Sequence, residues 1–390
     1  MSPSRDRRGS GAGAGSAGDR RGAGTGAGSA AEDGACDRCL ARSWLLARLA
    51  GHLELARRRI EPTLALADEA LIAAVGGDQR DAVLRELSRL DIEQVRARSA
   101  QAGLELICRC DPRYPARLAT LASRPAVLHV AGTLERFLDL IAEDPVAIVG
   151  ARRASPYGLE VARSLGRGLA RAGVTVLSGM ALGIDSAAHA GALAAPGPTV
   201  AVLPAGADQA YPRGKRSLYA QVRETGAAVS ELPPGSGVWR WTFPARNRII
   251  AALSAMTVVV EAGAGSGALL TAGFARWLDR PVGAVPGRVT SPQANGTNGL
   301  LAAGAHLVRG PQDVLDVLFG AGMRVVKLDP RPDLAPELRP LLAAIGDGHD
   351  TLAALMSAGL APHDGLAALA ALELAGYVRR EAGGRYSVVA

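Results

Sequence analysis

The sequence lacks several features that would place it in a membrane or outside the cell. Its longest apolar run, Met256 to Val260 with its flanks, falls well short of the roughly 20 residues that a spanning helix needs. No apolar segment at the N-terminus has the form of a secretion signal. Four cysteines in 390 residues are too few for a disulfide framework and are typical of a reducing compartment. We therefore expect a cytoplasmic protein that does not engage a membrane.

Acidic residues are scarce in the middle of the chain. The formal net charge is +7, but residues 1–30 carry +3, residues 31–140 are neutral and residues 311–390 carry −3. Residues 141–310 hold 16 Lys and Arg against 9 Asp and Glu, a net charge of +7. With 48% hydrophobic residues there is ample material for folded cores. The central segment is therefore where a fold would concentrate positive charge for a polyanion.

Composition divides the chain into four segments. Residues 1–35 are mostly Gly, Ala, Ser and Arg, which predicts a disordered tail. Residues 36–103 predict a small helical domain of SAM-like type, because large apolar residues recur there at helical spacing, among them Trp44, Leu45, Leu49 and Leu53. Residues 104–320 form the predicted core domain, with irregular, proline-containing residues 104–132 as a linker into it. Residues 321–390 read as three short helices and two strands, an order that resembles a winged helix; its negative charge favours a protein partner over DNA.

Short apolar runs alternate with helical stretches from residue 146 onward. The predicted strands cover residues 146–149, 174–177, 199–203, 257–260 and 282–285. This alternation predicts an α/β fold, a Rossmann-like, doubly wound and mostly parallel sheet with helices on both faces. Since ligands in such folds bind at the carboxyl ends of the strands, the residues directly after each run are the candidates for a site.

Two glycine-containing loops follow the first two runs. Gly150 and Arg152 lie in the first loop, and Ser178, Gly179 and Asp185 belong to the second. Glycine lets the backbone approach a ligand closely, amides at a helix N-terminus attract phosphate, and arginine adds a bidentate donor. Two adjacent anion-accepting loops suit a phosphodiester backbone.

Two later segments place cations beside an aromatic ring. Tyr211 precedes Lys215 and Arg216, and Phe243 precedes the run from Arg246 to Arg248. Such a combination can follow a nucleic-acid backbone while stacking bases. The alternative, in which the rings pack in the interior and the arginines are solvated, remains open for each segment alone.

Taken in this order, the segments resemble the DprA (Smf) family of bacterial DNA-processing proteins. The resemblance runs almost continuously over residues 146–310, in the segments VAIVGARRASPYG, LSGMALGIDSAAH, AVLPAGADQAYP, ELPPG, FPARNRIIAALS, VVVEA, SGALLTA, VPG and NGTNGLLAAGA. It implies a Rossmann-like core that binds single-stranded DNA, forms homodimers and helps to load the RecA recombinase in natural transformation or recombination. The implied activity makes and breaks no bonds, and it needs no cofactor.

The resemblance also assigns residues. The family's phosphate-contacting arginine falls on Arg152, and its lysine after the tyrosine-proline motif falls on Arg216. The residues predicted to bind nucleic acid are Gly150, Arg152, Arg153, Ser178, Gly179, Met180, Gly183, Asp185, Lys215, Arg216, Phe243, Arg246, Asn247, Arg248, Ser266, Gly267 and Thr271. Two positions depart from the family pattern: Leu182 stands where the family usually has arginine, and Lys215 where it commonly has asparagine.

Two enzyme classes share parts of this pattern. A nicotinamide dehydrogenase would show G-x-G-x-x-G after the first strand and an acid after the second, and neither is present. A nucleotide-processing phosphoribohydrolase is the stronger alternative, because Glu261 lies near Gly265 and Gly267 and could act as a catalytic acid or base. We expect instead that Glu261 is a buried acceptor for loop amides, since residues 267–278 hold no acid that would match such an enzyme.

The cysteines and one histidine complete the candidate groups. Cys36 and Cys39 together with Cys108 and Cys110 could supply four zinc ligands. The long helical segment between the two pairs matches a zinc ribbon poorly, so reduced thiols and no metal are the prediction. His189 is expected to be a hydrogen-bonded structural residue.

Overall fold

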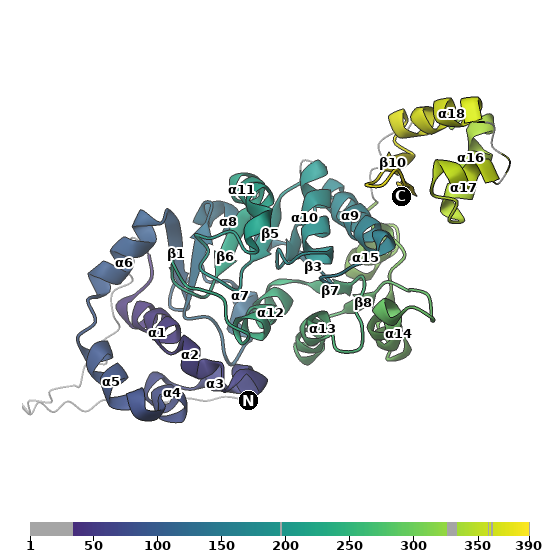
Figure 1. The fold of residues 1–390 in the computed structure, drawn as a ribbon. Coiled ribbons are helices and arrows are strands. Elements are labelled where there is room, and N and C mark those ends of the chain that lie inside the picture. The colour runs from purple at the N-terminus through teal and green to yellow at the C-terminus, as the bar shows by residue number, and fades with distance from the viewer. Residues whose placement is uncertain (1–33, 196, 326–333, 358, 360–361, 390) are drawn as a thin grey trace, which may run out of the picture.

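The computed structural model describes residues 34–195, 197–325, 334–357, 359 and 362–389. Figure 1 shows a group of helices at one end, a central sheet with helices on both sides, and a small C-terminal group at the other end. The predicted disordered tail falls outside the described residues except for Gly34 and Ala35. The helical part precedes the α/β part, as the sequence predicts.

Helices alone make up the first part of the described chain. They are α1 (Asp37–Arg48), α2 (Ala50–Leu53), α3 (Ile60–Ala65), α4 (Asp68–Val75), α5 (Arg80–Ser88) and α6 (Ile92–Gln101). Leu45, Leu49 and Leu53 recur every fourth residue and are fully buried in one cluster. That spacing places the three leucines on the same side of α1 and α2, which is why the sequence could be recognised as helical here.

Trp241 docks these helices onto the rest of the molecule. Its side chain is fully buried in the same cluster as the leucines of α1 and α2. The indole Nε1 donates to the carbonyl oxygen of Ala50 at 2.8 Å, and the backbone amide of Trp241 donates to Glu54 Oε2 at 3.1 Å. A large aromatic side chain whose polar atom is also satisfied makes this a firm junction.

The sheet is mixed but mostly parallel. Its strands are β1 (Leu104–Cys108), β2 (Val127–Ala131), β3 (Val146–Val149), β4 (Val176–Ser178), β5 (Thr199–Val202), β6 (Ala227–Ser230), β7 (Met256–Val259), β8 (Val282–Ala284) and β9 (His306–Leu307). They lie side by side in the order β1-β2-β6-β5-β4-β3-β7-β8-β9. Pairing is parallel from β6 through β9 and antiparallel for β1 with β2 and β2 with β6. The predicted α/β class and the predominantly parallel sheet are confirmed.

The strand order reverses at β3. The chain runs outward from β3 through β4 and β5 to β6, and then returns to place β7 on the other side of β3. The loops that leave β3, β4 and β7 therefore emerge next to one another at the carboxyl edge. In open α/β sheets this reversal opens a crevice in which ligands bind.

Four strands of the sheet, β1, β2, β6 and β9, were not predicted. The segment over residues 104–132, interpreted as a linker, contains β1 and β2, which pair with each other and extend the sheet. An antiparallel pair needs no crossover helix, so the alternation that identified the other strands is absent here. β6 has the sequence Ala-Ala-Val-Ser, which carries little of the β-branched content that marks a strand.

Alternate residues of each central strand face opposite layers. Val146 and Ile148 of β3 pack with α9 (Pro156–Arg171), α10 (Ile184–Ala194) and α15 (Pro311–Phe319). Ala147 and Val149 pack with α7 (Ala116–Ala119), α8 (Leu134–Ala142), α12 (Thr242–Leu253) and α13 (Gly267–Trp277). The remaining helices of this part are α11 (Arg216–Thr225) and α14 (Asn295–Ala302). Among the described helices, none is long and apolar enough to cross a membrane.

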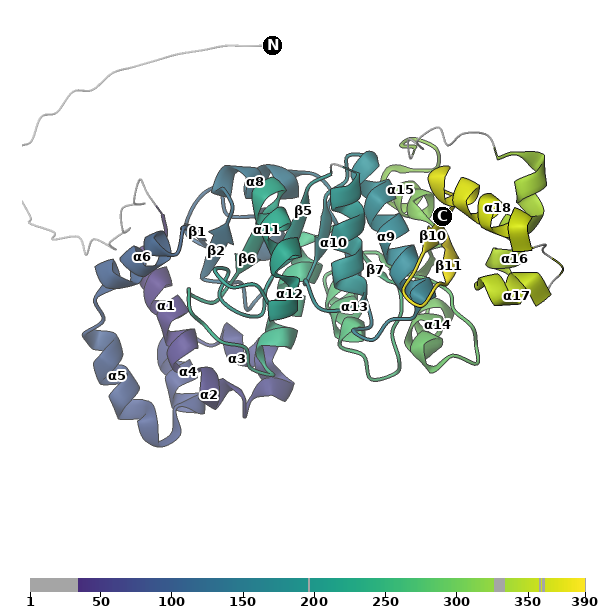
Figure 2. The ribbon, with the colours of Figure 1, turned by 45° about the horizontal axis from the view of Figure 1, so that its top comes forward.

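Helices α9 and α10 lie side by side at close range (Figure 2). A Cβ atom at Gly166 of α9 would lie 2.3 Å from the carbonyl oxygen of Ala188, and one at Gly191 of α10 would lie 2.1 Å from that of Arg163. Because these neighbours are backbone atoms, only glycine allows the approach. The two helices thereby hold a fixed position over β3 and β4.

The C-terminal part has its own small core. It contains α16 (Arg339–Gly346), α17 (Leu352–Ser357), α18 (Pro362–Leu374), β10 (Val378–Arg380) and β11 (Tyr386–Val388). The two strands are antiparallel, and a bridge between Thr351 and Arg385 adds to them. Three helices followed by a hairpin is the order from which a winged-helix-like domain is predicted. Arg379 of β10 donates to Glu160 of α9 at 3.1 Å, which joins this part to the sheet domain.

Arg248 of α12 is an interior residue, which contradicts its predicted place in a nucleic-acid site. The side chain is fully buried, and its Nη2 lies 2.7 Å and 2.9 Å from the two carboxylate oxygens of Glu231. The same guanidinium donates to the carbonyl oxygen of Ser123 at 2.8 Å and to its Oγ at 2.9 Å. The guanidinium donates its hydrogen bonds to groups inside the protein, so Arg248 has no access to a phosphate.

We expect Arg248→Ala to lower the free energy of unfolding by about 3–5 kcal/mol, because it leaves the buried Glu231 carboxylate without its partner. Urea denaturation followed by circular dichroism measures this loss. The exposed Arg240 is a suitable control, and Arg240→Ala should change the free energy of unfolding by no more than about 0.5 kcal/mol. Equal effects of the two substitutions would contradict the structural role of Arg248.

Candidate nucleic-acid interface

The loop after β3 is held in place from both sides. The backbone amide of Ala151 donates to the carbonyl oxygen of Glu261 at 2.7 Å. The Glu261 carboxylate accepts hydrogen bonds from the amide of Ser155 at 2.8 Å and from its hydroxyl at 2.5 Å. Ser155 Oγ in turn accepts from the amide of Gly158 at 3.0 Å and so caps α9. Glu261 is thus the buried acceptor for loop amides that the sequence predicts.

Arg152, which lies in this loop, is stacked on an aromatic ring. Its guanidinium carbon lies 4.3 Å from the centroid of the Phe243 ring, at the start of α12. The ring of Tyr211, from the loop after β5, lies 5.9 Å from that of Phe243 at an angle of 53°. A cation over an aromatic face is attracted by the ring quadrupole, so the guanidinium is held in place without losing its outward-facing donors. The cation on the Phe243 ring is thus Arg152, from a separate loop, and not one of the arginines that follow Phe243 in the sequence.

Arg246 lies beneath this pair, where it is almost completely buried. Its Nη1 donates to the carbonyl oxygen of Val202 at 3.2 Å and lies 3.8 Å from Asp185 Oδ2. Its Nε is buried and has no hydrogen-bond partner among the described residues. A buried donor without an acceptor costs free energy, and it is a group that an incoming anion can satisfy.

Asp185 and Gly179 fix the position of Arg246. Burial raises the pKa of the Asp185 carboxyl, and the charge of Arg246 lowers it in part. Burial likewise lowers the pKa of Arg246, which Asp185 opposes. A Cβ atom at Gly179 would lie 1.1 Å from Arg246 Nη1, so the guanidinium occupies space that only glycine leaves open.

These loops enclose a cavity of about 300 Å³ at the carboxyl edge of the sheet. It lies where the strand order reverses, between the loops that follow β3, β4 and β7. Its lining consists of Val149, Gly150, Arg152, Ala181, Asp185, Phe243, Arg246, Asn247, Ile250, Ser266, Gly267, Ala268 and Thr271. Residues predicted from four separate sequence segments therefore meet in one cavity.

Ser266 and Asn247 shape the far wall of the cavity. Ser266 Oγ accepts from the amide of Ala268 at 3.3 Å and caps α13, whose N-terminus faces the cavity. Asn247 Nδ2 donates to the carbonyl oxygen of Gly267 at 3.2 Å. The amide at a capped helix start adds partial positive charge to that of the arginines.

Several predicted residues of the second loop serve its conformation. Ser178 Oγ donates to the carbonyl oxygen of Ile148 at 2.6 Å inside the sheet. Met180 is fully buried with φ at 58°, and Gly183 has φ at 82° with Ala151 O only 2.2 Å from where a Cβ would be. The side chains of Ser178 and Met180 thus face the interior, and the loop meets the cavity through Ala181 and Asp185. Leu182, the departure from the family pattern, is 51% exposed.

Besides the buried Arg248, three predicted cations lie outside the cavity lining. Arg153 and Arg216 are exposed and Lys215 is half-buried. Lys215 and Arg216 stand at the start of α11, on the chain that continues from Tyr211.

Apolar wall residues and one buried histidine complete the comparison with the sequence. Val149, Ile250 and Ala268 line the cavity but were not predicted, because apolar residues in strands and helices give no signal that separates a cavity wall from the core.

His189 Nδ1 lies 2.8 Å from Thr199 Oγ1, and burial lowers the pKa of this histidine to about 3. His189 is therefore a neutral structural residue, as predicted.

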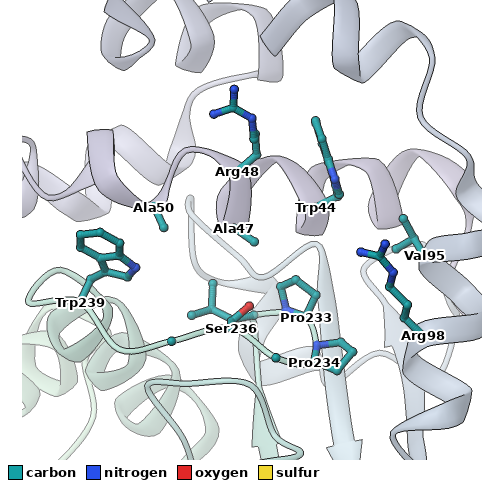
Figure 3. A pocket seen from close by; sticks show the side chains of 13 residues that line it. Trp44, Ala47, Arg48, Ala50, Val95, Arg98, Pro233, Pro234, Ser236 and Trp239 are labelled. Atoms are coloured by element: carbon teal, nitrogen blue, oxygen red, sulfur yellow. The ribbon is translucent and has the colours of Figure 1, made fainter. Parts of the chain in front are cut away.

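A second cavity, of about 360 Å³, lies between the helical part and the segment after β6. Figure 3 shows Trp44, Ala47 and Arg48 of α1 on one side of it and Pro233 and Pro234 on the other. Its walls are mostly apolar. This cavity lies at the end of β6. Because β5 lies between β6 and β4 in the sheet, the cavity is separate from the one at the reversal of strand order at β3.

Known proteins match this chain over the sheet domain and beyond it. The family described as DNA recombination-mediator protein A matches residues 105–319. A DNA processing protein DprA of Mycobacterium tuberculosis is 38% identical over 363 residues, which are 86% of this chain and 91% of that protein. The X-ray structure of DprA from Streptococcus pneumoniae superposes with a TM-score of 0.59 at 29% identity and covers 72% of this chain and 98% of that one. DNA processing protein A from Helicobacter pylori, described for its single-stranded DNA binding mode, gives a TM-score of 0.50 at 28% identity over 56% of this chain and 97% of that one. The chain therefore belongs to the DprA/Smf family of DNA processing proteins.

Proposed function

We propose that this protein binds single-stranded DNA at the cavity between the loops after β3, β4 and β7. The observation that carries the proposal is the pair of arginines in that cavity. Arg152 is stacked on Phe243 with its donors free to turn outward, and Arg246 keeps a buried Nε without an acceptor. A phosphodiester oxygen would accept hydrogen bonds from both guanidinium groups. The H. pylori relative, described for its single-stranded DNA binding, supports the choice of ligand.

A single strand fits this site better than a duplex. The ring of Tyr211 lies beside Phe243, whose own face carries Arg152, and bases are free to stack on such a ring only when they are unpaired. The contacts described are aimed at phosphate and at base planes, which are common to all sequences. We therefore expect affinity that depends on salt and tolerates changes of sequence.

Fluorescence anisotropy with labelled oligonucleotides across a salt series tests the proposal. We expect the wild-type protein to prefer the single strand and to lose affinity as salt rises. Arg152→Ala should weaken single-strand binding by about 1.5–3 kcal/mol, the range of a charge-assisted hydrogen bond. It should also reduce the salt slope by about 1, since one phosphate contact is lost.

Two matched variants separate position from charge. Arg152→Lys keeps the charge but not the planar, stacked donor, so it should recover only part of the affinity. Arg85→Ala removes one positive charge from the exposed surface of α5 and should change binding by less than about 0.5 kcal/mol. Equal affinity for single strands and duplexes, or wild-type binding by Arg152→Ala, would refute the proposed site.

We further propose that the protein acts without chemical change to its ligand. Glu261 is the acid that the phosphoribohydrolase alternative requires, and its two carboxylate oxygens are engaged by the amide and hydroxyl of Ser155. A carboxylate committed to holding a loop is poorly placed for proton transfer. Incubation with nucleoside monophosphates, followed by chromatography for free base, should give no release above a protein-free control. Release that disappears in Glu261→Gln would favour the phosphoribohydrolase alternative.

The family resemblance extends the proposal to two partners. We expect a homodimer, to be measured by sedimentation velocity. We also expect the protein to help load RecA onto the bound strand, to be measured as acceleration of RecA filament formation on strands already coated with a single-strand-binding protein. A monomer at all concentrations, or no acceleration, would remove the respective partner.

A further inference from the structure

The four cysteines of the chain come together where α1 meets the end of β1. Cys36 precedes α1 and Cys39 lies in its first turn, while Cys108 ends β1 and Cys110 follows two residues later. Their four Sγ atoms all lie within 4.8 Å of one another. Residues that are separated by some 70 positions in the sequence thus form one cluster.

The spacing is that of ligands around a single ion. Zinc–sulfur bonds of about 2.3 Å in a tetrahedron place neighbouring sulfurs about 3.8 Å apart. Cys39 Sγ and Cys110 Sγ lie 3.8 Å apart, which is far longer than the roughly 2.05 Å of a disulfide. We propose that Cys36, Cys39, Cys108 and Cys110 bind one Zn²⁺ as a structural site that fastens the helical domain to the sheet.

The surroundings suit a zinc tetrathiolate. The amide of Cys36 donates to Cys108 Sγ at 3.4 Å, the kind of backbone contact that orients a metal-bound sulfur. Zn²⁺ with four thiolates carries a charge of −2, and the positive end of α1 points at it. Arg38 precedes Cys39 and Arg109 follows Cys108 in the sequence, and both arginines line one surface pocket.

The cluster explains why two short motifs lie so far apart in the sequence. The helical domain forms the chain between Cys39 and Cys108, and an ion held at both ends closes that loop. Crosslinks that close long loops stabilise mainly by restricting the unfolded chain. β1 is the edge strand, and β2, β6 and β5 separate it from β4, so the ion would lie apart from the cavity proposed for DNA. The inference is independent of the proposed function.

Metal analysis of the full-length protein tests the inference. After purification with a reducing agent and without chelator, we expect close to one zinc per chain by inductively coupled plasma mass spectrometry. Replacement of zinc by Co²⁺ should give the sulfur-to-metal charge transfer and visible absorption of a tetrahedral thiolate site. This second measurement uses the wild-type chain, so it holds even if a variant fails to fold.

Variants identify the ligands. Cys110 is exposed, so Cys110→Ser disturbs packing least, and the double variant Cys39→Ser/Cys110→Ser removes one ligand from each pair. We expect the double variant to retain less than about a tenth of the wild-type zinc and to melt roughly 5–10 °C lower. Asp37→Ala is the matched control: its side chain is 75% exposed between Cys36 and Cys39, and zinc should be retained in full.

Three results would overturn the inference. They are a wild-type protein with four titratable thiols and no bound metal, a Cys39–Cys110 disulfide found by mass spectrometry, and zinc that stays in the double variant. The affinity for single-stranded DNA is measured alongside and should be unchanged in Cys110→Ser. A failure of DNA binding in the wild type would leave the zinc result untouched, so the two proposals stand or fall separately.

Discussion

The reversal of strand order at β3 is the constraint on which the candidate site depends. Because β4 and β7 flank β3 on opposite sides, the loops after all three strands open at the same place. Each loop contributes something different: Arg152 from the first, Asp185 from the second, and the capped start of α13 from the third. The glycine contacts between α9 and α10 keep the helices that follow the first two loops in register. The site is therefore a product of topology more than of any single motif.

Charge is arranged in two layers at this site. Arg246 and Asp185 form the inner layer, where each charge is almost fully buried and offsets part of the cost of burying the other. Arg152 forms the outer layer, where stacking on Phe243 orients it without neutralising it. From the surface inward, the exposed Arg152 comes first, and behind it lies Arg246, whose Nε has no hydrogen-bond partner among the described residues. Such an order favours an extended polyanion, whose successive phosphates can reach groups at different depths.

Much of this arrangement could be predicted from local pattern, and the failures share a physical cause. Strands β3, β5, β7 and β8 could be predicted from short apolar runs. β6 is rich in alanine, and β1 and β2 lack a crossover helix, so these three strands could not be predicted in the same way. Arg246 and Arg248 looked equivalent in the sequence, yet residues two apart on a helix point to nearly opposite sides. One therefore lines the cavity and the other is locked to Glu231. The four cysteines were recognised as possible zinc ligands but set aside, because nothing local in the sequence brings positions 39 and 108 together.

Trp241 bears on how this protein can be divided. Four contacts come from the eight residues Trp241 to Arg248. Trp241 packs against the helical domain and Phe243 lies under Arg152. Arg246 lines the cavity, and Arg248 pairs with the buried Glu231. A truncated chain that begins at β1 would bare the Trp241 indole and strip the hydrogen bonds to Ala50 and Glu54 from the first turn of α12. That turn also positions Phe243. The helical part therefore helps to position the aromatic ring of the candidate site.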